Sequence, residues 1–221
     1  NDFKLELAKA ALIAGNRAPS SVANEEILLD DSVPTVMDKV YNTNQDALNK
    51  AYHMLQEGAV RRAVELMSRA GQVVCLGQGN HSIVAEAAWA QFSTSSPKFK
   101  TAQDSHLQTV ILSTLAENDV VIYFSYTGAT HELLEAAELI ASRGAKMILV
   151  TRFLNAPAST FADTVLLCGP NELPLQFGSI AAIVAQMYVV DVLVSEYCRQ
   201  NHEEAERCRE SVGKALTQKC V

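Results

Sequence analysis

Five consecutive apolar residues, Val120–Phe124, lead straight into the hydroxyl-rich turn Ser125–Thr130. A pattern with helical periodicity follows at once over residues 131–140. An unbroken apolar run of this length is typical of a strand that is buried on both faces. Strands of that kind are typical of parallel sheets, whose two faces are covered by crossover helices.

The same alternation recurs along most of the chain. The sequence predicts five strands, at 72–76, 98–102, 119–125, 146–151 and 164–168. It predicts connecting helices at 82–94, 103–114 and 130–143, two helices ahead of the first strand at 32–55 and 59–69, and two closing helices at 177–200 and 202–217. Crossover helices impose parallel pairing and right-handed connections, so we expect a doubly wound five-stranded parallel sheet flanked by long helices.

The length of 221 residues suits one domain of ordinary size with some additional helix. Residues 1–14 have the pattern of a short helix, and residues 15–31 include typical linker residues such as Gly15 and Pro19. We therefore expect residues 1–31 to be separate from a main domain at 32–221.

Composition excludes several classes of function. The net charge is −7 and no basic patch is visible, so this chain is not expected to bind nucleic acid by itself. No signal peptide or membrane span is predicted. The five cysteines are scattered without metal-ligand spacing, which favours free thiols in a cytoplasmic protein over disulfides or zinc. The sequence predicts neither a bound metal ion nor a cofactor.

Two loops stand at the carboxyl ends of predicted strands, where open α/β sheets bind their ligands. The loop Gly77–Ser82 has two glycines but not the full dinucleotide fingerprint, because Ser82 stands where a third glycine belongs. The turn Ser125–Thr130 gathers hydroxyls and backbone N–H groups at the positive end of a helix. This arrangement predicts an anion site, most commonly for phosphate; the alternative is an ordinary turn in which Thr130 caps the helix.

The turn reads Ser-x-Thr-Gly-x-Thr after an apolar strand, which resembles the phosphosugar-binding signature of SIS (sugar isomerase) domains. The resemblance runs from about Asp31 to the last long helix and includes Gly77-x-Gly79 with Ala85, Asp104-x-His106-x-Gln108, Glu117–Ile122, Gly144–Lys146, Ala162-Asp163, Glu172, Ala185-Gln186 and Asp191. With the paired helices ahead of the first strand, this set resembles the effector domain of RpiR-type transcription regulators. It implies a flavodoxin-like SIS fold.

The resemblance also implies roles for the matching residues. It places Ser125, Thr127 and Thr130 on the phosphate, assisted by the backbone around Tyr126 and Gly128. The rest of the sugar would be held by Gly79, Asn80, His81, Ser82 and Glu172.

Three positions depart from the family pattern. His81 stands where the family usually has a serine, Gln91 where a lysine is frequent, and Gln176 where an arginine is frequent. The two missing cations imply a ligand less acidic than a sugar acid phosphate.

The function implied by the resemblance is that of a sensor for a sugar phosphate, assembled as a homodimer or homotetramer through its long helices. In this family an N-terminal helix-turn-helix domain reads the operator DNA, and residues 3–10 resemble the tail of its last helix. We therefore expect residues 1–31 to be the remnant of that domain and its linker. Operator DNA would be bound only through the missing N-terminal domain.

Two other functions stay open. SIS-type isomerases and lyases use the same phosphate turn and need a general base, for which Glu86, Glu172 and His106 are the candidates. An enzyme would bury Glu86 against the pocket, whereas a sensor would leave it on a helix surface. The third possibility is a scaffold with an unoccupied pocket, which would bind no phosphosugar at all.

Overall fold

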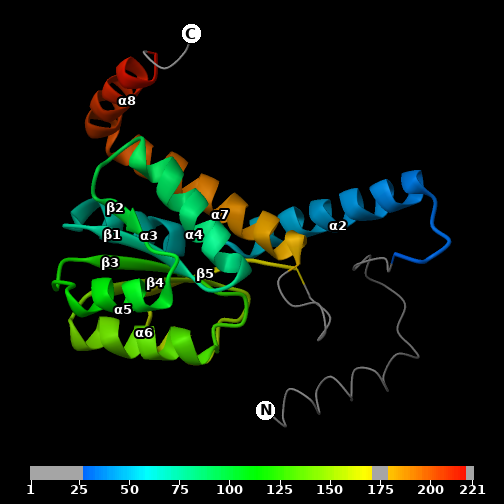
Figure 1. Cartoon of the computed structure of the whole chain (residues 1–221), viewed down its shortest axis with the longest axis horizontal. Coiled ribbons are helices and arrows are strands. Elements are labelled where there is room, and N and C mark those ends of the chain that lie inside the picture. The colour runs from blue at the N-terminus through cyan, green and yellow to red at the C-terminus, as the bar shows by residue number, and fades with distance from the viewer. Residues whose placement is uncertain (1–26, 171–178, 218–221) are drawn as a thin grey trace.

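The computed structural model describes residues 27–170 and 179–217 (Figure 1). The predicted N-terminal helix and most of the predicted linker lie outside the described residues. So do three residues discussed above, namely Glu172, Gln176 and Cys220.

All five predicted strands form, each within one residue of its expected ends. They are β1 (Val73–Gly77), β2 (Phe99–Thr101), β3 (Val120–Phe124), β4 (Lys146–Thr151) and β5 (Thr164–Leu167). Every neighbouring pair is parallel, and the strand order is β2-β1-β3-β4-β5. This is the order of flavodoxin-like sheets, so the predicted doubly wound five-stranded parallel sheet is confirmed.

The predicted helices also form. They are α2 (Val33–Met54), α3 (Glu57–Arg69), α4 (Asn80–Ser93), α5 (Ser105–Ser113), α6 (His131–Ser142), α7 (Ile180–Gln200) and α8 (His202–Thr217). The connection between β4 and β5 contains a short 3-10 helix, η1 (Pro157–Phe161), where the sequence predicted only a turn. The expected start of α7 at residue 177 lies outside the described residues.

Alternate residues of each strand supply two separate core layers. Val73 and Ile122 face one side, where they pack with residues of α2, α3, α4 and α7. Val74 and Tyr123 face the other side, where they pack with residues of α5 and α6. Figure 1 shows α5 and α6 on one side of the sheet and α4 and α7 on the opposite side. Burial on both faces explains why the strands are continuous apolar runs.

Side-chain caps fix where several helices begin. Ser32 accepts a hydrogen bond from the Thr35 backbone N–H at the start of α2, and Ser179 does the same for Ala182 at the start of α7. Asp104 accepts from the Leu107 N–H at 3.0 Å and so caps α5. Each such cap satisfies one of the N–H groups that a helix start leaves unpaired.

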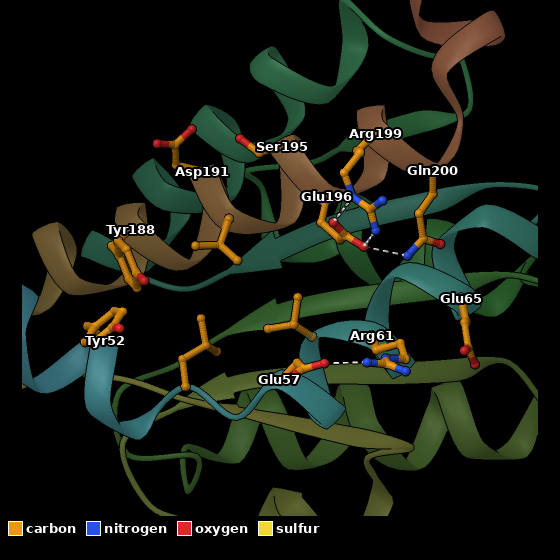
Figure 2. Close-up of a pocket in the computed structure, with 13 residues that line it drawn as sticks. Tyr52, Glu57, Arg61, Glu65, Tyr188, Asp191, Ser195, Glu196, Arg199 and Gln200 are labelled. Carbon is orange, nitrogen blue, oxygen red and sulfur yellow. Dashed lines mark hydrogen bonds and ion pairs between the residues drawn. The ribbon is translucent and has the colours of Figure 1, made fainter.

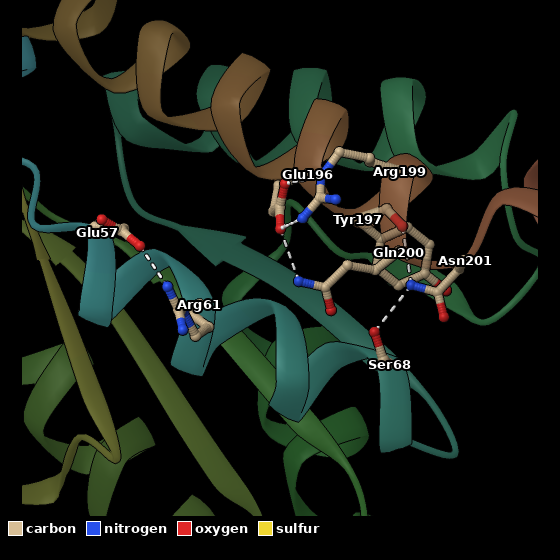
Figure 3. A network of polar contacts seen from close by, with 8 residues as sticks. All are labelled: Glu57, Arg61, Ser68, Glu196, Tyr197, Arg199, Gln200 and Asn201. Atoms are coloured by element: carbon tan, nitrogen blue, oxygen red, sulfur yellow. Dashed lines mark hydrogen bonds and ion pairs between the residues drawn. The ribbon is translucent and has the colours of Figure 1, made fainter.

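A cluster of three aromatic rings packs α4, β2 and the end of α7 together. The rings of Phe92 and Phe99 stack with centroids 4.3 Å apart, and Tyr197 meets both edge-on. In the adjacent polar network (Figure 3), the Asn201 side chain donates to Ser68 Oγ and to the Tyr197 carbonyl, each at 2.9 Å. These contacts tie α3, α4 and the α7–α8 junction together.

Helix α2 extends away from the sheet (Figure 1), and only Ala47 and Ala51 of this helix are buried. Its large apolar side chains are mostly exposed: Met37 is 65% exposed and Tyr41 is 64% exposed. We call the exposed row Val33, Met37, Tyr41, Leu48 and Tyr52 the α2 stripe. Because these residues recur at helical spacing, they lie on one side of the helix.

Within the described part of the chain, α7 alone is long and apolar enough to cross a membrane by length and composition. It packs against α2, α3 and α4, and its inner face, which includes Ala185, Val189 and Leu193, is buried. This packing accounts for its apolar composition as that of a core helix.

Four cysteines fall within the described residues, and all four are free thiols, as predicted. Cys75, Cys168 and Cys198 are buried, and Cys208 is half-buried. Burial raises the pKa of the Cys75 thiol to about 12, so this thiol stays protonated at neutral pH.

Candidate functional site

The sheet brings the two predicted loops together. Strands β1 and β3 are neighbours, with Gly77 paired to Phe124, so the loops that follow them start side by side. The chain runs from β1 outward to β2 and then returns to β3 on the other side of β1. This is the topological switch point of the sheet, where open α/β folds bind their ligands.

The hydroxyl turn, Ser125–Thr130, folds back on its own backbone. Ser125 is buried, and its Oγ accepts a hydrogen bond from the Gly128 N–H at 3.1 Å. Thr127 Oγ1 accepts from the Ala129 N–H at 3.4 Å. Thr130 occupies the N-cap position of α6, but its side chain makes no capping hydrogen bond. The turn therefore presents hydroxyls and uncapped N–H groups at the positive end of a helix, as an anion site requires.

Neighbouring strand ends hold the turn in place through Tyr126. Its carbonyl accepts hydrogen bonds from Thr151 Oγ1 at 3.0 Å and from the Arg152 N–H at 3.1 Å. Its phenol donates to the Pro170 carbonyl at 2.8 Å, and its ring meets Phe153 edge-on at 5.7 Å. Tyr126 is thus anchored to residues that follow β4 and β5, which makes the turn rigid.

The first loop starts α4 with a sharp reversal. Gly79 is the N-cap with a φ of 57°, and Ser82 Oγ donates to the Gly79 carbonyl at 2.7 Å. A side chain at Gly77 would place its Cβ 2.6 Å from the His81 carbonyl oxygen, so the close approach of this loop to its strand needs glycine there. Asn80, the first residue of α4, is exposed.

His81 joins the two loops. Its Nε2 accepts a hydrogen bond from the Tyr126 backbone N–H at 3.3 Å, and its Nδ1 lies 2.8 Å from Gln186 Oε1 on α7. The predicted sugar-side residue therefore contacts the predicted phosphate turn directly. Gln186, which the resemblance named without a role, is buried and lies opposite the ring.

Two further parts of the site had no role assigned from the sequence. Gln108 is buried and bonds to the Gln78 side chain and to the Ala102 carbonyl, each at 2.8 Å, so it joins the loops that follow β1 and β2. On the far side of the turn, Thr127 and Arg152 line a pocket of about 490 Å³. Thr151 is the last residue of β4 and Arg152 follows it directly, and this position at a strand end was the available signal.

The candidate general bases are not gathered at the turn. Glu86 is exposed on α4, where its carboxylate accepts a hydrogen bond from the Gln103 side chain. His106 is exposed at the start of α5. The third candidate, Glu172, lies outside the described residues.

A groove of about 910 Å³ shares no residue with either loop (Figure 2). It lies between the end of α2, helix α3 and helix α7, and its lining includes Tyr52, Glu57, Arg61, Tyr188, Asp191, Glu196 and Arg199. Both arginines are paired on their own helices, Arg61 with Glu57 and Arg199 with Glu196 (Figures 2 and 3). Hydrogen bonds from Arg199 and Gln200 lower the pKa of Glu196 to about 2. Both arginines of this groove are therefore already engaged by carboxylates of their own helices.

Comparison with known sequences identifies the fold family. The sequence profile of the SIS domain matches residues 66–196, which is more than half of the chain. The chain belongs to the SIS domain family. The matched segment of this SIS domain holds all five strands and both loops of the site.

Curated relatives of this SIS domain are helix-turn-helix regulators. An uncharacterized HTH-type transcriptional regulator of Caldanaerobacter subterraneus is 28% identical over 88% of this chain and 69% of its own length. The HTH-type transcriptional regulator HexR of Escherichia coli is 28% identical over 89% of this chain and 66% of its own length. The chain thus spans about two thirds of the length of these relatives.

Solved structures share the fold. The Vibrio vulnificus NanR protein, complexed with ManNAc-6P, superposes with a TM-score of 0.79 at 23% identity, covering 84% of this chain and 71% of NanR. The sugar isomerase domain of an RpiR transcription factor from Sphaerobacter thermophilus superposes with a TM-score of 0.72 at 22% identity, covering 83% of this chain and 99% of that one.

Proposed function

We propose that this SIS domain is the phosphosugar-binding sensor of a bacterial transcription regulator of the RpiR type. The observation that carries the proposal is the hydroxyl turn at the switch point, where Ser125, Thr127 and an uncapped helix start converge. The relatives support it, because the two curated relatives described above are HTH-type regulators and NanR was solved with a sugar phosphate. Such a regulator acts in the cytoplasm and binds operator DNA through a helix-turn-helix domain.

The proposed mechanism of phosphate binding starts from the hydrogen bonds within the turn. When a phosphate enters, the hydroxyls of Ser125 and Thr127 rotate from accepting backbone N–H groups to donating toward the phosphate oxygens. The hydroxyl of Thr130 and the first N–H groups of α6 complete the cradle. The sugar then extends toward the first loop at Gly79, Asn80, His81 and Ser82, and Glu172, which the resemblance also assigns to the sugar, lies outside the described residues.

We expect a thermal-shift screen with sugar phosphates to raise the melting temperature of this chain selectively. Ser125→Ala and Thr127→Val should each weaken binding by about tenfold or more, because each loses a charge-assisted hydrogen bond to the phosphate. Thr109→Val is the matched control, since Thr109 is an exposed threonine on α5 that lies outside the site. Free sugars and inorganic phosphate serve as reference ligands. Equal binding by the turn variants and the control would place the pocket elsewhere.

The proposal treats the domain as a sensor without catalysis, and the exposed position of Glu86 favours this over an isomerase or lyase. We expect no conversion of hexose or pentose phosphates by the chain. Glu86→Gln should leave the affinity for sugar phosphates unchanged within about twofold, because surface substitutions away from a site have small effects. If the wild-type chain converts a sugar phosphate and Glu86→Gln or Glu172→Gln abolishes this turnover, the chain is an enzyme and the proposal of a sensor without catalysis is wrong.

We propose in addition that the chain assembles as a symmetric homodimer through α2 and α7. The α2 stripe is exposed, and Leu48 of this stripe borders an apolar groove of about 520 Å³ that also includes Val184, Met187 and Val194 of α7. A twofold axis would lay the α2 stripe of each copy against the α2–α7 surface of the other, because one surface then serves both subunits. A change in the α2–α7 arrangement would alter the spacing of the two DNA-reading domains.

A further inference from the structure

Two hydrogen bonds of His81 indicate which nitrogen of its ring carries the proton. A backbone N–H can only donate, so Nε2, which receives the Tyr126 N–H, carries no proton. Nδ1 therefore carries the proton of the neutral ring and donates it to Gln186 Oε1 at 2.8 Å. One ring thus connects the middle of the hydroxyl turn with helix α7.

The donor that His81 holds is part of the hydroxyl turn. Tyr126 lies between Ser125 and Thr127 in this turn, and the Gly128 N–H bonds to Ser125 Oγ. A phosphate bound at the turn would draw on its N–H groups, because each bond to a charged oxygen is stronger than a neutral one. A phosphate that takes the Tyr126 N–H would compete with His81 Nε2 for that donor.

The other partner of the ring lies deep in the helical layer. Gln186 is 2% exposed, and its neighbours on α7 include the buried residues Ala182, Ala185 and Val190. A buried amide among apolar side chains is costly unless it is hydrogen-bonded, so the position of Gln186 depends on its bond to the ring. Because α7 packs along α2, a displacement of Gln186 on α7 would also alter the packing of α2.

We infer that His81 transmits occupancy of the hydroxyl turn to helix α7 through Gln186. Phosphate that takes the Tyr126 N–H removes that hydrogen bond from Nε2, and the ring then shifts and lengthens or gives up its bond to Gln186 Oε1. The inference rests on the proposed phosphosugar function and adds to it the route of the signal. A serine, which the resemblance places at this position in the family, has a single hydroxyl and is too short to join both partners. Histidine has two nitrogens on opposite sides of a ring, and this geometry makes His81 a positioning residue for both the hydroxyl turn and helix α7.

The first test is nitrogen NMR of the histidine rings, with inorganic phosphate as the probe. The chain has five histidines, and His81→Gln assigns the His81 signals by their loss. In the free protein we expect the signature of a neutral ring protonated on Nδ1. Addition of phosphate should shift both nitrogens of His81, and Ser125→Ala should prevent this shift at the same phosphate concentration.

The second test is a double-mutant cycle on phosphate affinity, measured by calorimetry. Gln186→Leu removes the anchor of the ring, so the ring competes less well for Tyr126, and phosphate should bind about fivefold more tightly. His81→Ala should tighten binding similarly, and adding Gln186→Leu to it should give no further change. Val189→Ala, a packing change on the same helix, should leave the affinity unaltered, and Gln186→Met supplies a second variant without the amide.

The outcomes separate this inference from the function on which it rests. If the wild-type chain binds phosphate and Ser125→Ala weakens it, but the His81 signals stay fixed or the two substitutions act independently, the transmission by His81 is wrong and the sensor function stands. If neither inorganic phosphate nor any sugar phosphate binds the wild-type chain, the proposed function is overturned and the inference with it.

Discussion

Gly128→Ala is expected to destabilise the domain by about 2–4 kcal/mol and to abolish phosphate binding. Gly128 has a φ of 61°, a left-handed conformation that an alanine adopts only at a cost. A Cβ at this position would stand 2.5 Å from the Ala156 Cβ and 3.2 Å from Thr151 Oγ1. The backbone has little freedom to move away, because the Gly128 carbonyl accepts a hydrogen bond from the Ala158 N–H. Urea unfolding and phosphate calorimetry on the same variant measure both effects.

Gly79→Ala is the matched control for this substitution. Gly79 also has a positive φ, of 57°, but a Cβ there would meet nothing within 4 Å. It should therefore lose only the conformational term, about 1–3 kcal/mol, because a φ of 57° with a ψ of −131° is a combination that L residues rarely adopt. Equal losses at Gly79 and Gly128 would mean that the contact with Ala156 contributes nothing, and an unchanged phosphate affinity in Gly128→Ala would remove the turn from the site.

The strands and helices were predictable because local pattern and tertiary environment agree in them. Val120–Phe124 is buried from end to end, so its apolar run carries the whole signal of a central strand. The start of α5 was predictable for the same reason, since Asp104 caps the helix through its nearest neighbours in sequence. The position of the hydroxyl turn belongs to this class as well, because the end of β3 and the start of α6 define it within a few residues.

The contacts that complete the site could not be read from local pattern. His81 lies 45 residues from Tyr126 and 105 residues from Gln186, and nothing near His81 in the sequence indicates either partner. The polar Gln186 within an apolar helix signals a buried hydrogen bond, yet the sequence does not say with what. The anchoring of the turn by Thr151 likewise depends on β3 and β4 being neighbours. The role of Glu172 stays a prediction.

Introducing aspartate at Met37 and Tyr41 together is expected to convert the chain from a dimer to a monomer. Both side chains are about two-thirds exposed in the single chain, and in the proposed dimer they lie against the α2–α7 surface of the second copy. A carboxylate buried there would lack a partner, and twofold symmetry places each substitution in the interface twice. The dissociation constant should rise by on the order of a hundredfold or more. Sedimentation equilibrium over a range of protein concentrations measures it.

Asn42→Asp separates this expectation from a simple effect of charge on the helix. Asn42 is exposed on the same helix, and its position is well away from the α2 stripe around the helix axis. It adds the same carboxylate without placing it in the proposed interface, so the dimer should persist. The melting temperature of the doubly substituted monomer then becomes informative, because the core on both faces of the sheet needs no residue of the α2 stripe. A folded monomer that still binds sugar phosphate would show that the stripe serves assembly alone. If the doubly substituted chain stays dimeric, the proposed dimer interface at α2 is wrong. Ligand binding at the hydroxyl turn would then have to change the spacing of the DNA-reading domains through another interface.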